Sequence, residues 1–304
     1  EHHTPLYRQE LKFTRQDIAI SRQTMAGWMG GCADVLQPLY ERMREKILGC
    51  DIVLNDDTPV EMLDPGRGET RTARLWCTVG AEDFKYTLYN FTLSRGREGP
   101  LEFFKGYQGK FLSDAYGGYH ELWQKPGVIP SGCWAHARRY FVTAQDTSAK
   151  AATEILTLIA RLYRVEEEFK RASPAQRLKG RQKESVPVLQ KIAAWLKTHA
   201  ADHLPQSPMR KAIDYSLGIW EALNVYVSDG RLPIDNNLAE NAIRPVALGR
   251  KNWLFVGSEN GGETAAILMS FCTTCRKLKI NTWEYLEDVL QRINTCPISK
   301  IDDL

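Results

Sequence analysis

Three consecutive β-rich segments between residues 51 and 94 constrain the fold of this chain more than any other feature. They read DIVLNDDTPVEML, TRTARLWCTVG and FKYTLYNFTLS, and the turn-forming stretches DPGRGE and AED separate them. Branched and aromatic residues favour strands, whereas Gly, Pro and Asp favour turns. The pattern therefore predicts a three-stranded antiparallel meander.

Two units of strand followed by helix come after the predicted meander. The segment GPLEFFKGY reads as a short helix, and GKFLSDAYGGYHELW and VIPSGCWAHARRYFVTA each pass from an extended apolar run into a helical one. Antiparallel strands combined with such units predict an α/β fold, in which a mixed sheet carries helices on its faces.

Helical patterns lie on both sides of these segments. Residues 4–48 are expected to form helices that start at Thr4 and Ser21, with a break near Gly30. They are interpreted either as a helix-turn-helix that reads DNA or as a helical hairpin packed on a core. Residues 146–230 repeat apolar residues at helical spacing and are also expected to be helical.

A basic tract interrupts this second helical region. Residues 170–183, KRASPAQRLKGRQK, contain six Lys or Arg residues and no acid. Such a tract forms either a solvated hinge or a segment that lies along DNA phosphates, and the sequence leaves both interpretations open.

Composition narrows the class of protein. A chain of 304 residues with 43% hydrophobic residues can bury a large core in one or two domains, and a net charge of +3 permits a polyanionic partner without demanding one. Seven scattered cysteines suit a reducing cytoplasm. No apolar run approaches the roughly 20 residues of a membrane helix, and we expect no signal peptide. Because the first residue is Glu1, we expect the chain to be a fragment or a processed form.

Three acids stand where an α/β fold uses carboxylates. Asp56 interrupts an apolar strand, Asp114 ends another strand, and Glu240 lies on a later helix. Taken singly, each is explained by surface exposure, helix capping or an ion pair. Taken together, three acids at one edge of a mixed sheet suit hard cations such as Mg²⁺, two of which activate a nucleophile and a leaving group on phosphorus.

Glu240 belongs to the stretch IDNNLAENAIRP, residues 234–245. We predict a short helix ended by Pro245, on which Asn236, Glu240 and Arg244 share one face.

Several segments, taken in order, resemble the insertion-sequence 66 family of bacterial transposases. The resemblance spans nearly the whole chain, and its most specific part runs from residue 229 to residue 266. The segments are HTPLYRQ, TMAGWM, DDTPVEMLDPGRGETRTARLW, SDAYGGY, CWAHARRYF, DGRLPIDNNLAENAIRPVALGRKNWLFVGSENGGETAA and TWEYLEDVLQRI.

The resemblance implies a ribonuclease H-like fold with a helical insertion between the second and third catalytic acids. It implies that Asp56, Asp114 and Glu240 are the catalytic and metal-binding residues of a DDE-type transposase that uses two Mg²⁺ or Mn²⁺ per site. The domain limits that follow are an N-terminal helical segment, a core in two parts around the insertion, and a C-terminal helical segment, at residues 1–48, 49–145, 146–230, 231–270 and 271–304.

The resemblance also implies partners and a location. DNA, both as transposon ends and as target, is the expected partner of a homo-oligomer in the bacterial cytoplasm at the nucleoid, with accessory transposition proteins and no membrane. Expected DNA-binding residues lie near the acids or beside an aromatic residue, where cations follow a strand of DNA. They are Arg138, Arg139, Asn236, Arg244, Arg250, Lys251 and Trp253, with Asp57 and His136 as weaker site candidates.

The sequence departs from the family pattern at two positions and in its extent. Asp57 replaces a more frequent Glu, and Asn241 replaces a frequent Arg, which removes one phosphate contact. The family carries an upstream region with a zinc-binding segment, and this chain is expected to begin after it.

Other chemistries compete with this interpretation. The pairs Cys133–His136 and Cys272–Cys275 have zinc-ligand spacing, although Cys272 lies in an apolar stretch that reads as a buried helix. A structure-selective nuclease of the same fold and a non-catalytic DNA-binding remnant of a transposase are the alternative functions. Glycoside hydrolysis by paired carboxylates ranks last, because it leaves the basic residues without a purpose.

Overall fold

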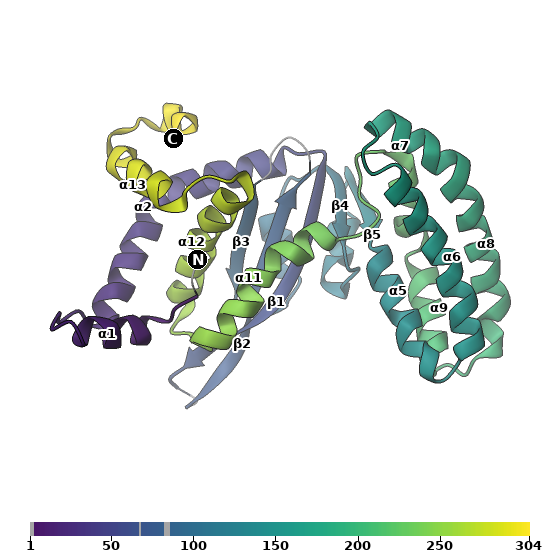
Figure 1. Ribbon diagram of the computed structural model, residues 1–304, viewed down its shortest axis with the longest axis horizontal. Coiled ribbons are helices and arrows are strands. Elements are labelled where there is room, and N and C mark those ends of the chain that lie inside the picture. The colour runs from purple at the N-terminus through teal and green to yellow at the C-terminus, as the bar shows by residue number, and fades with distance from the viewer. Residues whose placement is uncertain (1–2, 67, 82–85) are drawn as a thin grey trace. The chain divides into compact units, whose positions relative to one another are not determined.

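The computed structural model describes residues 3–66, 68–81 and 86–304, and they form two compact units (Figure 1). Unit 1 comprises Glu1–Tyr107 and Leu238–Leu304, and unit 2 comprises residues 108–237. In sequence, unit 2 is therefore inserted into unit 1. The two units are described in turn.

The sheet of unit 1 contains the meander that the sequence predicts. Strands β1 (Ile52–Asp64), β2 (Glu69–Gly80) and β3 (Thr87–Thr92) pair antiparallel in chain order. The short strand β6 (Phe255–Val256) pairs parallel with β1 and makes the sheet mixed. These pairings confirm the predicted meander and mixed sheet. Parts of the predicted turns and the first residues of the predicted third strand (67 and 82–85) lie outside the described residues.

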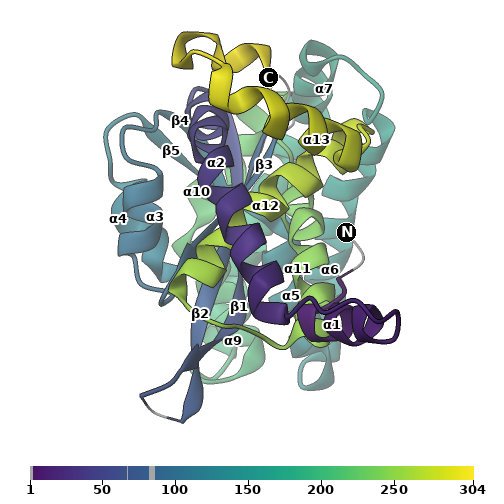
Figure 2. The same ribbon diagram turned by 90° about the vertical axis from the view of Figure 1, so that its left-hand side faces the viewer.

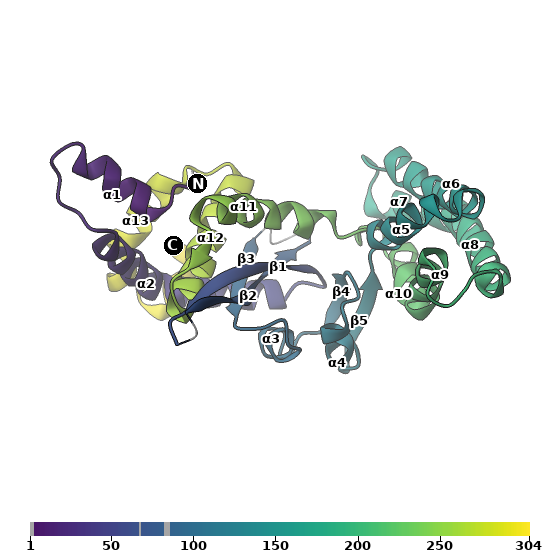
Figure 3. The same cartoon turned by 90° about the horizontal axis from the view of Figure 1, so that it is seen from below.

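Helices pack on this sheet. Helix α12 contacts β3 and also packs against α2, and Figures 2 and 3 show these elements from two sides. Figure 3 shows α11 and α12 on the same side of β1 and β2. The helices of unit 1 are α1 (Leu6–Thr14), α2 (Arg22–Leu48), α3 (Glu98–Phe103), α11 (Asn237–Trp253), α12 (Glu259–Leu278) and α13 (Thr282–Arg292), followed by 3₁₀ turns at Ile293–Thr295 and Ile298–Asp303.

The first two helices correct details of the sequence prediction. Ser21 caps α2 as expected, because its side chain accepts the Thr24 N–H at 3.1 Å. Helix α1 instead begins at Leu6, and Thr4 does not cap it. Helix α2 runs without the expected break at Gly30, where an added Cβ would meet open space, so this glycine reflects no close contact. Helix α1 contacts α2 but buries none of its residues.

The outer edge of β3 is closed by side chains rather than by a further strand. The Tyr89 N–H donates to the Ser270 hydroxyl at 2.8 Å, and its carbonyl accepts the Tyr40 hydroxyl at 2.8 Å. One turn along α12, the Thr274 hydroxyl accepts the Thr87 N–H at 3.0 Å and donates to the Thr87 carbonyl at 3.2 Å. Buried backbone groups at this edge are thus paired by residues of α2 and α12.

Unit 2 begins with the two predicted strand-to-helix units. Strands β4 (Gly109–Ser113) and β5 (Val128–Gly132) are parallel, and α10 and α4 pack against β5. The remaining part is helical, as the sequence predicts for residues 146–230. The helices of unit 2 are α4 (His120–Trp123), α5 (Trp134–Thr143), α6 (Ala149–Glu168), α7 (Pro174–Gly180), α8 (Val186–His199), α9 (Pro208–Gly218) and α10 (Trp220–Asn224); a π-helical turn (Arg181–Ser185) joins α7 to α8, and 3₁₀ turns lie at Gly117–Tyr119, Ala144–Asp146, Ala200–Asp202 and Val225–Ser228.

The basic tract at residues 170–183 forms α7 and the π-helical turn, and two of its arginines are used inside unit 2. Arg181 is fully buried, and its guanidinium donates to the Glu166 carboxylate at 2.8 and 2.6 Å. The same group donates to the carbonyls of Tyr226 and Asp229. Arg177 donates to three further carbonyls, one of which is that of Gly230. Arg177 and Arg181 therefore belong neither to a solvated hinge nor to a phosphate-binding segment, because their hydrogen bonds hold unit 2 together.

No helix in the described part of the chain combines the length and the apolar character that a membrane crossing requires.

Candidate active site

Asp56 is half-buried near the centre of β1 and forms a row with residues of the next two strands. It lies opposite Cys77 of β2, which in turn lies opposite Tyr89 of β3. Residues directly opposite one another in antiparallel strands share a face of the sheet. Burial, and then the negative charge of Asp56, raise the pKa of the Cys77 thiol. The carboxylate therefore faces the side of the sheet that carries Cys77 and Tyr89.

Helix α11, which carries Glu240, is bonded to this same face at two points. The Tyr89 hydroxyl donates to the Ala242 carbonyl, two residues after Glu240. Further along, the Arg250 guanidinium donates to the Thr58 hydroxyl at 2.8 Å and to the Pro59 carbonyl at 2.7 Å. Thr58 shares the face of Asp56, because side chains alternate along a strand. Within unit 1, the helix of Glu240 thus covers the face of β1 that carries Asp56.

Asp57 faces the opposite side of the sheet and forms a buried ion-pair cluster. Its side chain is 1% exposed and accepts from Arg74 at 3.0 Å and from Arg95 at 2.8 Å. Two guanidinium groups neutralise this carboxylate where water does not reach it. Asp57, a weaker site candidate in the sequence, therefore has a structural role.

Asp114 belongs to unit 2, where it directly follows β4 and is half-buried. Its carboxylate accepts the Tyr116 N–H at 3.0 Å, and its carbonyl accepts the Tyr215 hydroxyl at 2.8 Å. The next residue, Ala115, has a φ of 61°, which is a left-handed conformation that costs energy for a residue with a Cβ. Both hydrogen bonds and this turn fix the direction in which the carboxylate leaves the strand.

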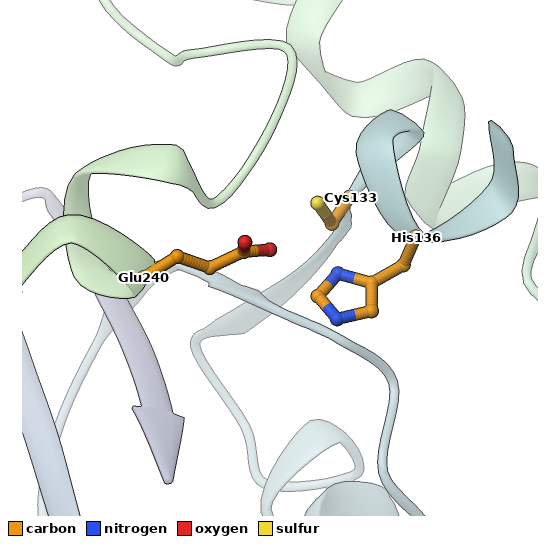
Figure 4. A group of neighbouring side chains, drawn as sticks. All are labelled: Cys133, His136 and Glu240. Carbon is orange, nitrogen blue, oxygen red and sulfur yellow. The ribbon is translucent and has the colours of Figure 1, made fainter. Parts of the chain in front are cut away.

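The start of α5 holds the chain that leads into α11. The Trp134 N–H donates to the Ile234 carbonyl at 3.1 Å, and the Asn236 N–H donates to the Cys133 sulfur at 3.2 Å. Figure 4 shows Cys133 and His136 at the start of α5, together with the side chain of Glu240 on α11. The Cys133 sulfur thus has a structural use in unit 2.

Helix α11 corrects the sequence prediction at both ends. It begins at Asn237, so Asn236 precedes the helix instead of sharing its face. It also passes through Pro245 and ends at Trp253. A proline removes one intrahelical hydrogen bond. The buried ring and the contacts on either side of it, from Tyr89 and Arg250, hold α11 continuous at this point.

The predicted DNA-binding residues differ in exposure. Arg138 and Arg139 on α5 are exposed, as are Arg244 and Lys251 on α11. The remaining three are more enclosed: Arg250 is half-buried and bonded to β1, Trp253 is half-buried and its indole lies against Gly249, and Asn236 is fully buried.

The cysteines of α12 behave as packing residues. Cys275 is buried, and its thiol lies near the Tyr285 ring, where burial and this thiol raise the pKa of the phenol. Among the described residues, neither Cys272 nor Cys275 belongs to a group of three or more metal-binding side chains. The zinc interpretation therefore gains no support from this pair.

The donor set suits a hard divalent cation. Asp56, Asp114 and Glu240 offer carboxylate oxygens from half-buried positions, which Mg²⁺ and Mn²⁺ prefer to sulfur. The register of strands β1–β3 cannot be read from the sequence. For this reason nothing in the sequence indicated that Tyr89 and Thr58 bind α11 to the sheet face that carries Asp56.

The chain matches a known protein family along most of its length. The profile described as "Transposase IS66 family" matches residues 1–264, and the chain belongs to this family of transposases. It is 34% identical to the uncharacterized protein y4jD of Sinorhizobium fredii, over 96% of this chain and 60% of that protein. It is 33% identical to the uncharacterized protein y4qI of the same organism, over 99% of this chain and 58% of that protein. The chain thus spans about 60% of the length of these relatives.

Proposed function

We propose that this chain is the catalytic region of a DNA transposase, which cleaves DNA strands at transposon ends and joins them to target DNA. Membership of the transposase family supports the reaction class. The structural observation that carries the proposal is the attachment of α11 to the face of β1 that bears Asp56. This attachment supports a site to which a helix and a strand from distant parts of the sequence each contribute an acid.

The proposed site consists of Asp56, Asp114 and Glu240. Two Mg²⁺ or Mn²⁺ held by these carboxylates would lower the barrier to attack on phosphorus and stabilise the departing oxygen. The three carboxylates would contribute mainly by geometry, because their negative charges would hold the metal ions in fixed positions.

The proposed reaction is a hydrolysis followed by a transesterification. In the first, a water oxygen attacks the phosphodiester, the bond from phosphorus to the 3′ oxygen breaks, and a 3′-hydroxyl is released. In the second, that hydroxyl attacks a phosphodiester of the target, a new P–O bond forms, and a target 3′-hydroxyl leaves.

DNA contacts are proposed for the exposed cations. Arg138, Arg139, Arg244 and Lys251 would pair with phosphates, which position DNA without reading its sequence. Trp253 remains a candidate for stacking on a base. We also propose that the protein assembles as a homo-oligomer on DNA at the nucleoid, together with accessory proteins. Its fold is proposed to be a ribonuclease H-like core in which α6–α10 form the insertion.

Metal binding is the first test. Calorimetric titration of the protein with Mn²⁺ should show binding that Glu240→Gln and Asp114→Asn both abolish or weaken more than tenfold. The matched control is Glu259→Gln, which alters an exposed acid on α12. Equal binding by the wild type, Glu240→Gln and Asp114→Asn would exclude the proposed site and favour a non-catalytic DNA-binding protein.

The second test separates transposition from simple cleavage. A DNA duplex with a free 3′-hydroxyl is incubated with the protein, Mn²⁺ and a supercoiled plasmid. Joined product supports strand transfer, and we expect Asp114→Ala to abolish it while DNA affinity is retained. Plasmid nicking without joined product would instead identify a nuclease of the same fold.

A further inference from the structure

Tyr89 connects four elements of unit 1. Its backbone N–H is bonded to Ser270 of α12 and its carbonyl to Tyr40 of α2, while the residue itself lies in β3. Its side chain extends to α11, where the hydroxyl donates to the Ala242 carbonyl. The residue is completely buried, its two backbone bonds are buried, and the bond to α11 is partly buried.

The hydroxyl of Tyr89 is held in a donating state. Burial, and then the nearby Cys77 thiol, raise the pKa of the Tyr89 phenol, which therefore keeps its proton at neutral pH. The Thr273 hydroxyl lies 3.3 Å away and can donate to the phenol oxygen. With that oxygen accepting from α12, its proton is directed to α11.

The accepting carbonyl lies at a weak point of α11. Ala242 comes three residues before Pro245, whose ring nitrogen cannot donate to the carbonyl one turn earlier. Helices lose stiffness where such a bond is missing. A bond from outside the helix, next to that gap, fixes the first turns of α11, and Glu240 lies in them.

The register of the sheet sets the level at which this bond acts. Tyr89 lies in one row with Cys77 and Asp56 across the three strands. The bond to α11 therefore starts from the row of residues that contains Asp56.

We propose that Tyr89 is a positioning residue for the acidic site: its hydroxyl holds the start of α11, and Glu240 with it, against the sheet face that carries Asp56. This inference rests on the proposed function for its consequence, because only a metal site depends on the separation of those two acids. The contact between Tyr89 and α11 is tested independently of that function.

The decisive variants are Tyr89→Phe and Tyr40→Phe. Each removes one buried hydroxyl that is bonded to a carbonyl, but only that of Tyr89 is bonded to α11. Tyr40→Phe is therefore a matched control for the loss of a buried hydrogen bond in the same region.

Two readouts are compared for the full chain. Hydrogen exchange of the amides at residues 241–249 should accelerate about tenfold or more in Tyr89→Phe and remain unchanged in Tyr40→Phe. Mn²⁺ affinity, measured by calorimetry, should fall about five- to tenfold in Tyr89→Phe alone. Unchanged exchange in α11 of Tyr89→Phe would overturn the inference, as would accelerated exchange with unchanged Mn²⁺ affinity. If the wild type itself binds no Mn²⁺, the proposed function fails and the positioning of a metal site fails with it, whereas the exchange result still decides whether Tyr89 holds α11.

Discussion

The guanidinium of Arg250 lies 2.8 Å from the Thr58 hydroxyl and donates to it, which ties the last turns of α11 to the strand of Asp56. Its neighbour Lys251 is exposed. The sequence predicts both cations as DNA contacts, yet the structure uses the first one internally. Adjacent positions on a helix face different directions, and this difference can be measured.

Arg250→Ala is expected to lower the free energy of unfolding by about 2 kcal/mol, because two hydrogen bonds from a charged donor are lost. Lys251→Ala is expected to change stability by less than about 0.5 kcal/mol. It should instead reduce the slope of log affinity for DNA against log salt by about 1. Urea unfolding and anisotropy titrations at several salt concentrations provide these values. An equal fall in the salt slope for both variants would show that Arg250 also contacts phosphate.

Asp56 and Asp57 are neighbours on β1 with opposite roles. Asp57→Asn should lower the free energy of unfolding by about 3–5 kcal/mol, because it leaves two partly buried guanidinium groups without their carboxylate. Asp56→Asn should keep the wild-type stability and lose Mn²⁺ binding. Thermal unfolding and calorimetry of the two variants measure both effects. The assignment is reversed if Asp57→Asn folds as stably as the wild type but no longer binds metal.

The environment of the Asp229 carboxylate in unit 2 should make the free energy of unfolding depend on pH. Burial alone would raise the pKa of Asp229, but hydrogen bonds from Arg231 and Lys110 outweigh it and hold this pKa well below its ordinary value of 3.8. A carboxylate whose pKa is lowered by folding stabilises the folded state at pH values above its ordinary pKa. This stabilisation is lost as the pH falls below the ordinary pKa. Asp229→Asn should therefore cost about 2 kcal/mol at pH 7, and this difference from the wild type should shrink below pH 3.8.

Urea unfolding at a series of pH values tests the role of Asp229. Lys110→Gln removes one of the two donors and should move the loss of stability toward higher pH. A cost of Asp229→Asn that stays constant down to pH 3 would contradict the role of these ion pairs.

Arg181 and Lys179 test the interpretation of the basic tract. Arg181→Met leaves the Glu166 carboxylate without its partner and should cost about 3–5 kcal/mol. Lys179→Met changes an exposed side chain and should be neutral within about 0.5 kcal/mol. Chemical unfolding of both variants distinguishes them. Similar stabilities would mean that the buried pair contributes little to unit 2.

The order of the elements was accessible from the sequence because it depends on local patterns. The β-rich runs, the cap at Ser21 and the helical spacing after residue 146 each act over a few residues, and the structure contains all of them. The end of α11 was not accessible in this way. Proline is a frequent helix terminator, but contacts on both sides of Pro245 come from distant parts of the chain and override that preference.

The roles of individual site residues were harder to predict for the same reason. Asp56 and Asp57 have identical side chains, and only the strand register together with the bonds of α11 to Tyr89 and Thr58 shows which of them shares the face of α11. Arg181 and Lys183 belong to one basic tract, yet one is fully buried and the other exposed. Residue type limits what a position can do, whereas the long-range packing decides what it does.

The hydroxyl groups along the edge of β3 also affect how copies of the chain meet. An open strand edge can recruit a strand from another molecule and begin aggregation. At β3, Ser270, Thr274 and Tyr40 occupy the backbone groups of Thr87 and Tyr89 that a foreign strand would need. These hydroxyls come from helices, so the edge of β3 is protected from pairing with another molecule only while α2 and α12 stay docked. Partial unfolding of either helix would expose unpaired backbone groups of β3 to a strand of a second copy.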